Sequence, residues 1–207
     1  MASPISAGGA CYDPAMSEPE SGTDLRVDEA MRTLLLAIGE DPEREGLQRT
    51  PERMRRMYEE LTSGYRTDPD SVINGASFEV AYDEMVVVRD IEFFSLCEHH
   101  LLPFYGRAHV GYLPRGRVIG LSKIPRIVDM FARRLQVQER MTQQVAEFLM
   151  ERLEPKGVGC VLEASHLCTI MRGVRKQQAQ MVTSSMLGTF RRDGRTRNES
   201  LKLIGRG

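Results

Sequence analysis

The stretch that decides the fold is residues 85–121, MVVVRDIEFFSLCEHHLLPFYGRAHVGYLPRGRVIGL. Its first part, Met85–Phe94, is rich in Val, Ile and Phe and predicts a β-strand. Its last part holds two more strand-like runs, Arg107–Leu113 and Arg117–Leu121, on either side of Pro114-Arg115-Gly116, which predicts a β-hairpin. Antiparallel strands are therefore expected in the middle of the chain.

Helical periods lie on both sides of this stretch. Downstream we expect helices over 123–134 and 138–153, strands over 159–165 and 181–190 around a basic turn, and a short helix over 198–204. Upstream, one helix is predicted from Val27 to a stop at Gly39, and a second from Thr50, with Pro51 in its first turn, to Gly64. The sum is an α+β domain with a largely antiparallel sheet.

Composition narrows the class of protein. The chain has 207 residues, of which 41% are hydrophobic and 28% charged, as in an ordinary globular protein. A formal net charge of −1 argues against a protein built to coat nucleic acid or an anionic membrane. No apolar run reaches the about 18 residues of a membrane span, and no secretory signal is recognised. Four scattered cysteines fit reduced thiols, so we expect a cytoplasmic protein.

The N-terminus differs from the rest of the chain. Residues 1–25 are rich in Ser, Pro, Gly, Ala and Glu and show no apolar period, so we expect a disordered tail that contains Cys11. Residues 26–207 are expected to form one domain.

Two short segments carry a metal-ligand pattern. Cys97 and His100 have C-x-x-H spacing, which lets one turn present a thiolate and an imidazole to a single zinc ion, and Cys168 is the best candidate for a third ligand. A Cys2His set leaves one position open, as a catalytic zinc requires. His166 faces the metal if 166–168 is extended, and with His99 it is a candidate for proton transfer.

Other interpretations of this metal-ligand pattern do not require a catalytic zinc. C-x-x-H alone is a weak signal, and a metal that only staples the fold would need four protein ligands. We expect Cys160 to be a core residue and His109 to be a hairpin residue.

A candidate anion site follows the predicted hairpin. Ser122 is a suitable N-cap, and a helix N-terminus with Lys123 and Arg126 beside it can bind a polyphosphate, to which Arg172 adds a guanidinium. The alternative is that these are solvated surface charges. Glu139, next to Gln138, could accept hydrogen bonds from the pairing edge of guanine, or could be an exposed helix residue.

Four motifs resemble the GTP cyclohydrolase I family, in order over roughly residues 27–204. They are Ser95–Gly106, Gly120–Arg126, Leu135–Arg140 and Ser165–Gly173. The resemblance implies zinc bound by Cys97, His100 and Cys168, with His99 and His166 in proton transfer. It also implies that Glu139 holds guanine, that Gln138 lines the same pocket, and that the triphosphate is surrounded by Ser122, Lys123, Arg126 and Arg172.

The resemblance extends to fold, assembly and reaction. It implies the tunnelling fold, with an antiparallel sheet, helices packed on one face and additional N-terminal helices, and a toroidal homodecamer with active sites between subunits. The implied reaction opens the imidazole ring of GTP at C8, releases formate and gives 7,8-dihydroneopterin triphosphate, the first step of folate or tetrahydrobiopterin biosynthesis. The rivals are a non-catalytic zinc- and GTP-binding regulator and another tunnelling-fold enzyme that acts on a pterin-like substrate.

Overall fold

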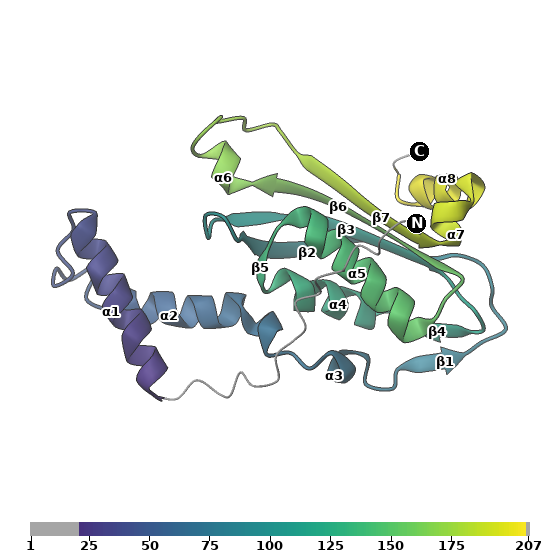
Figure 1. The fold of residues 1–207 in the computed structure, drawn as a ribbon, viewed down its shortest axis with the longest axis horizontal. Coiled ribbons are helices and arrows are strands. Elements are labelled where there is room, and N and C mark those ends of the chain that lie inside the picture. Colours follow the sequence, from purple (N-terminus) through teal and green to yellow (C-terminus); the bar gives the residue numbers. More distant parts are fainter. Residues whose placement is uncertain (1–20, 206–207) are drawn as a thin grey trace, which may run out of the picture. The chain divides into compact units, whose positions relative to one another are not determined.

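The computed structural model describes residues 21–205 of the chain, with side chains from residue 26 (Figure 1). Most of the expected tail lies outside these residues, and its last five fall in the first helix. The elements are α1 (Ser21–Ala37), α2 (Thr50–Leu61), the 3-10 turn η1 (Ser63–Tyr65), α3 (Pro69–Ile73), β1 (Ser77–Glu79), β2 (Val86–Cys97), β3 (Pro103–Leu113), β4 (Arg117–Ile119), α4 (Lys123–Ala132), β5 (Leu135–Gln136), α5 (Gln138–Leu153), β6 (Gly157–His166), α6 (Leu167–Ile170), β7 (Met181–Gly188), α7 (Thr189–Arg192) and α8 (Gly194–Leu203).

The chain divides into two compact units, residues 1–60 and 61–207, and the division falls inside the expected 26–207 domain. In the first unit α1 begins six residues before Val27 and ends near Gly39, whose φ of +89° terminates the helix as predicted. The two helices of this unit are joined by an ion pair between Arg55 Nε and Asp28 Oδ1, at 3.2 Å.

The second unit is built on a five-stranded sheet of order β5-β2-β3-β6-β7. All its pairs are antiparallel except β2 with β5, so the predicted antiparallel sheet is confirmed. β2 and β6 are both longer than predicted, and β6 ends at His166. None of the described helices is long and apolar enough to cross a membrane.

The predicted hairpin across 114–116 is wrong. β4 pairs with β1 in a separate two-stranded sheet, although the chain does turn at Gly116 with φ of +76°. The reason is that β3 is already paired along its length on one edge with β2 and on the other with β6, so no edge remains for β4. A side chain links the two elements instead, since the Tyr112 hydroxyl accepts a hydrogen bond from the Ile119 N–H at 3.1 Å.

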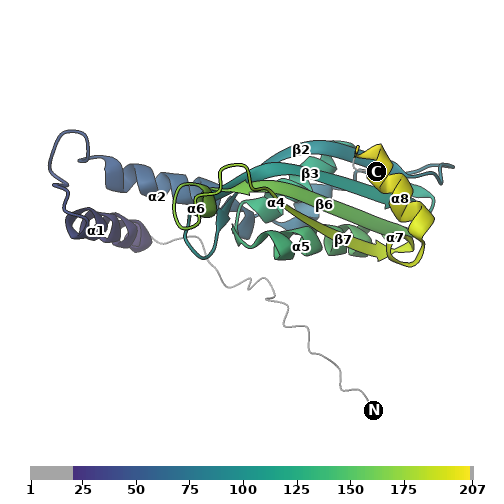
Figure 2. The ribbon, with the colours of Figure 1, turned by 90° about the horizontal axis from the view of Figure 1, so that it is seen from above.

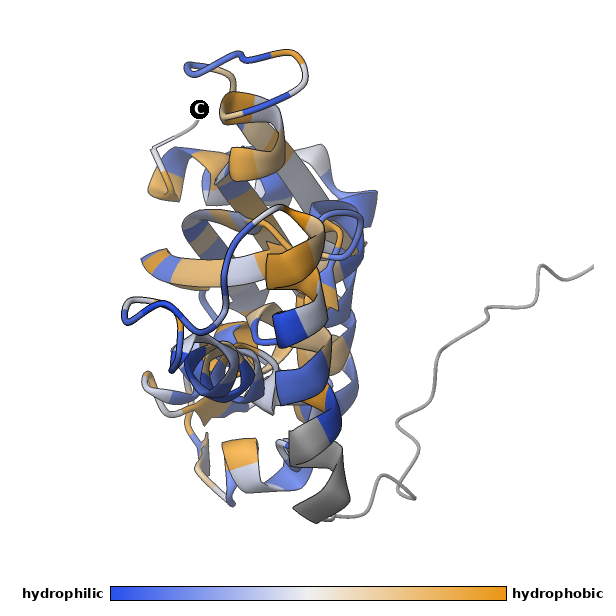
Figure 3. Cartoon of the chain, turned by 90° about the vertical axis from the view of Figure 1, so that its left-hand side faces the viewer, coloured by the Kyte–Doolittle hydropathy of each residue, from blue (hydrophilic) through white to orange (hydrophobic). Residues whose placement is uncertain are grey.

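The helices α4 and α5 cover one face of the sheet (Figure 1). The main hydrophobic core lies between this face and the two helices. Alternate strand residues point into this layer, including Phe93, Phe104 and Leu162, and they meet Ile127 of α4 and Met141 of α5. The bounds of α5 match the prediction, and α4 ends two residues before the predicted end. Figure 3 shows hydrophobic colours along the strands and hydrophilic colours along several of the loops.

Part of the opposite face is covered by the C-terminal helices, which adds to the expected arrangement with helices on one face (Figure 2). The predicted strand over 181–190 ends at Gly188, because the chain turns into α7 there. Phe190 of α7 is fully buried against Gly159, where a Cβ atom would lie 2.7 Å from the ring. A glycine on β6 therefore makes the room that this ring needs.

Candidate functional site

The three predicted metal ligands come together at one end of the sheet. Cys97 is the last residue of β2, His100 lies in the turn that follows, and Cys168 lies in the first turn of α6. Their ligand atoms all lie within 4.8 Å of one another. His99 is outside this group, and its Nδ1 lies 3.7 Å from Cys97 Sγ.

These donors fit a zinc ion. Tetrahedral zinc with thiolate and imidazole ligands would place the ligand atoms about 3.3–3.8 Å apart, which small side-chain rotations from the observed spacing can reach. Burial raises the pKa of the Cys168 thiol, and the neighbouring Cys97 raises it further, while the positive charge of Arg172 opposes the rise. A divalent cation reverses this balance, because it favours the thiolates that the two sulfurs would otherwise disfavour.

His166 reaches the site by a route that differs from the predicted one. Residues 166–168 are not extended, because His166 ends β6 and the helix α6 begins at Leu167. The imidazole stacks on the Phe104 ring, its pairing partner on β3, with centroids 4.7 Å apart and parallel planes. Burial lowers the pKa of His166, and the nearby Glu139 carboxylate opposes this shift. Phe104 was missed from sequence, although it lies within the 95–106 motif, between a half-buried Pro103 and an exposed Tyr105.

Gln138 fixes the orientation of His166. This glutamine is 1% exposed, and its Nε2 donates to the backbone oxygens of Leu162, at 3.1 Å, and Met181, at 3.0 Å. Carbonyl oxygens only accept, so the amide oxygen must face the other way, where it lies 2.9 Å from His166 Nε2. An amide oxygen also only accepts, and His166 Nε2 therefore carries the hydrogen of this bond. Gln138 is also the residue expected to line the substrate pocket, and its amide atoms are hydrogen-bonded to protein groups.

The remaining guanine and phosphate candidates divide between two places. Glu139 follows Gln138, the residue hydrogen-bonded to His166, and its carboxylate acts to raise the pKa of that histidine. Arg172 follows Cys168 by four residues, and its charge acts to lower the pKa of that thiol. Glu139 also lines a hollow of about 750 Å³ beside β7, with Thr183 and Arg191 in its wall.

Ser122, Lys123 and Arg126 lie elsewhere. They follow β4, which contacts Tyr112 near the Gly157 end of β6, whereas Cys168 follows the His166 end. The ten residues of β6 separate these ends by about 30 Å. The helix α4, which carries the basic residues, starts at this end and leads back to β5, where Leu135 pairs with Leu96 beside Cys97.

The start of α4 differs from its predicted form. Ser122 occupies the N-cap position, but it has helical φ and ψ and no side-chain capping bond, because the turn is closed by the Lys123 N–H bonded to Gly120 O at 2.8 Å. Lys123 is buried, so it is not an ordinary solvated surface charge, while Arg126 is exposed.

Cys160 and His109, which were not predicted to belong to the site, differ in how well their predicted positions hold. Cys160 is fully buried in β6, as predicted. His109 is not a hairpin residue, because it is buried within β3, where its Nδ1 accepts a hydrogen bond from the Asp90 N–H at 3.2 Å and its Nε2 lies 3.7 Å from Glu163 Oε1.

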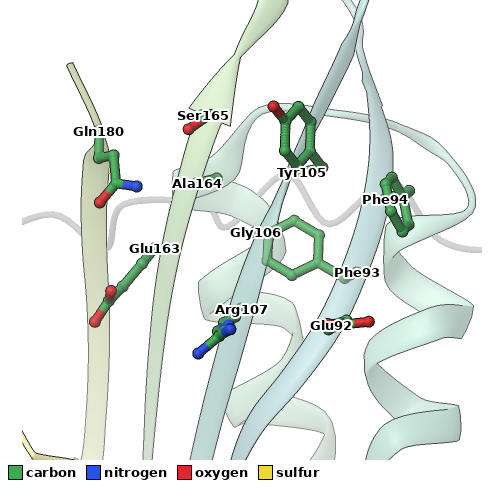
Figure 4. A pocket seen from close by; sticks show the side chains of 10 residues that line it. All are labelled: Glu92, Phe93, Phe94, Tyr105, Gly106, Arg107, Glu163, Ala164, Ser165 and Gln180. Atoms are coloured by element: carbon green, nitrogen blue, oxygen red, sulfur yellow. The ribbon is translucent and has the colours of Figure 1, made fainter. Parts of the chain in front are cut away.

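A separate hollow of about 400 Å³ lies on the sheet face opposite α4 and α5 (Figure 4). The stacked rings of Phe94 and Tyr105, with centroids 5.9 Å apart, stand at one side of it. Glu92 and Arg107 lie on the same two strands, β2 and β3, and Glu163 lies on β6. None of the predicted metal, proton-transfer or substrate residues lines this hollow.

Comparisons with known proteins agree with the geometry. The family model described as GTP cyclohydrolase I matches residues 27–205. A protein named GTP cyclohydrolase 1 from Synechococcus sp. (strain JA-3-3Ab) is 58% identical over 192 residues, which cover 92% of this chain and 84% of the relative. A protein of the same name from Leptospira biflexa is 58% identical over 181 residues, 87% of this chain and 99% of the relative.

One solved structure is more distant. The apo form of the archaeosine synthase QueF-Like has a TM-score of 0.44 and 16% identity, and the match covers 52% of this chain and 96% of that one. The fold is therefore described from its own strand pairing. The family match spans both units and every residue of the metal cluster, and the chain belongs to the GTP cyclohydrolase I family.

Proposed function

We propose that this chain is a zinc-dependent GTP cyclohydrolase, which opens the imidazole ring of GTP at C8, releases formate and yields 7,8-dihydroneopterin triphosphate. The observation that carries the proposal is the grouping of Cys97, His100 and Cys168 within 4.8 Å, next to His166, in a chain of this family. Those three residues would hold the ion. When bound, zinc activates water as a nucleophile near neutral pH.

The chain's own groups supply proton transfer. His166 Nε2 is engaged by Gln138, so Nδ1 is the atom that remains to exchange a proton with the ring nitrogen of the substrate. The parallel Phe104 ring limits rotation of the imidazole. His99, whose Nδ1 lies near Cys97 Sγ, is the second proton-transfer group in this proposal.

Substrate recognition needs residues from both ends of the sheet. Glu139 would accept hydrogen bonds from guanine, and Arg172, which lies near Cys168, would contact the triphosphate together with Ser122, Lys123 and Arg126. Those three lie at the start of α4, which follows β4 at the other end of β6, and in this proposal they would come from a neighbouring subunit. The proposed assembly is a homodecamer with sites between subunits.

Formate release from GTP by the purified protein tests the proposal. Samples are compared before chelation, after chelation and after return of Zn²⁺, with ATP as the control nucleotide. We expect formate from GTP alone, lost on chelation and restored by Zn²⁺. If the protein binds zinc and GTP but releases no formate, it is a non-catalytic binding protein and the proposal fails.

A further inference from the structure

The turn that carries the metal ligands has little packing to hold it. Residues 98–101 are all exposed, and Leu101 has a left-handed φ of +54°. Backbone bonds define its outline, with Leu101 N–H bonded to Cys97 O at 2.8 Å and Glu98 N–H bonded to Gln136 O at 3.0 Å. Exposed side chains in such a turn are free to move unless another group binds them.

One side chain of the turn is bound from outside it. The Glu98 carboxylate, between the ligand Cys97 and the two histidines, forms an ion pair with the Arg140 guanidinium of α5. The pair is partly exposed, so its direct contribution to folding stability is small.

Arg140 is itself held in place before it reaches Glu98. Its Nη2 donates to Leu135 O at 3.0 Å, and its Nε donates to Gln136 Oε1 at 3.1 Å. Gln136 is 1% exposed, and its Nε2 donates to Phe131 O at 2.9 Å and to Gln144 Oε1 at 2.8 Å. The amide oxygen of Gln136 is thereby directed at Arg140, and a buried network fixes the guanidinium.

We propose that Arg140 is a positioning residue for the metal centre, which acts through Glu98 to hold the 97–100 turn so that Cys97 and His100 present their ligand atoms together. The inference rests on the proposed zinc site and adds a group that does not touch the ion. Groups of this kind commonly change metal affinity by about 10–100-fold when they are removed.

Charge alone would give a different pattern. Glu98 is an anion near a cation site, so a purely electrostatic role predicts weaker zinc binding in Glu98→Gln and tighter binding in Arg140→Gln. Positioning predicts weaker binding in both, because each substitution releases the same side chain.

The experiment measures the zinc dissociation constant of the full-length protein by competition with a chromogenic chelator. We expect Arg140→Gln and Glu98→Gln each to raise this dissociation constant by about tenfold. The dissociation constant of the double variant should not exceed that of the single variant that binds zinc more weakly. Arg140→Lys keeps the positive charge but loses the several N–H donors of the guanidinium, so its zinc affinity should lie between those of Arg140→Gln and the wild type. Arg152→Gln is the matched control, since it removes another ion pair of α5, with Asp70, far along the helix.

The outcomes separate the two proposals. Tight zinc binding by the wild type and equally tight binding by Arg140→Gln would overturn the positioning role and leave the zinc site intact. Additive losses in the double variant, or tighter binding by Arg140→Gln, would also overturn it. A wild-type protein that binds no zinc would overturn the proposed function and this inference together. Thermal unfolding of the metal-free variants checks that an affinity change does not come from misfolding.

Discussion

At the scale of single residues, the structure shows which groups hold His166, the proposed proton-transfer residue. Its ring lies parallel to Phe104, its Nε2 is hydrogen-bonded to Gln138, and a carboxylate is nearby. The residue is thus held on two sides, with one ring nitrogen left for chemistry. Sequence reasoning identified the histidine but not the groups that hold it.

His166→Ala should abolish formate release while zinc and GTP still bind, because the imidazole is outside the ligand set and the guanine contact. Removal of the donor leaves the buried Gln138 oxygen without this partner, at a cost of about 1–3 kcal/mol, so a lower unfolding temperature is also expected. Zinc content, GTP binding and formate are measured on the same preparation. Normal turnover in this variant would remove His166 from proton transfer.

Cys160 gives a pH-dependent prediction. Burial raises the pKa of its thiol from 9.0 to about 12, so between these values the unfolded chain releases a proton that the folded chain keeps. Stability is therefore present in full below pH 9 and falls as the pH rises, by at most about 1.4 kcal/mol per pH unit. The free energy of unfolding of wild type, less that of Cys160→Ala, should shrink from pH 9 upward. A constant difference would contradict the buried, protonated thiol.

At the scale of elements, the close approach of β3 and β6 is what aligns Phe104 with His166. Gly106 lies in this contact, and a Cβ atom there would meet Glu163 O at 1.8 Å and Ala164 Cα at 2.7 Å. These are backbone atoms of a paired strand, which cannot move aside as a flexible side chain can.

Gly106→Ala should therefore destabilise the fold by about 1–3 kcal/mol and lower activity, since the pair Phe104–His166 is two residues away along the strand. Chemical denaturation and amide hydrogen exchange over 163–166 measure the two effects. Gly194→Ala is the control, because its Cβ would meet nothing within 4 Å. Equal stability of the two variants would contradict the close strand contact.

At the scale of the whole molecule, the proposed site draws on elements that start from opposite ends of β6. The metal cluster and His166 lie at one end, and α4, which carries Arg126, follows β4 from the other end. The proposed decamer of 23.4 kDa chains has a mass of about 234 kDa, which sedimentation equilibrium would measure. A monomer that retains full activity would contradict sites between subunits.

Subunit complementation tests the same arrangement through activity. His166→Ala and Arg126→Ala should each be inactive alone, whereas co-expressed chains should regain activity. The reason is that some interfaces then combine an intact His166 from one subunit with an intact Arg126 from another. Co-expressed chains that assemble together but stay inactive would show that both residues act within one chain.

The sequence by itself determined most of the long helices and strands and the chemical groups of the proposed site. The 3.6-residue period defined α5, the alternation of apolar residues marked the central strands, and the C-x-x-H spacing with Cys168 singled out the residues that the fold brings within 4.8 Å. These signals are local, because each depends only on neighbours along the chain or on ligand chemistry.

Only the tertiary structure decided which strands pair and what surrounds each functional side chain. β4 joins β1 because both edges of β3 are occupied, and α6 begins at Leu167, which directs Cys168 toward Cys97. Gln138, predicted to line the substrate pocket, is also the support of His166, because Leu162 and Met181, distant in sequence, offer it carbonyl oxygens. Partner choice in a sheet, and burial of a polar side chain, depend on the whole packed core, and no local pattern encodes them.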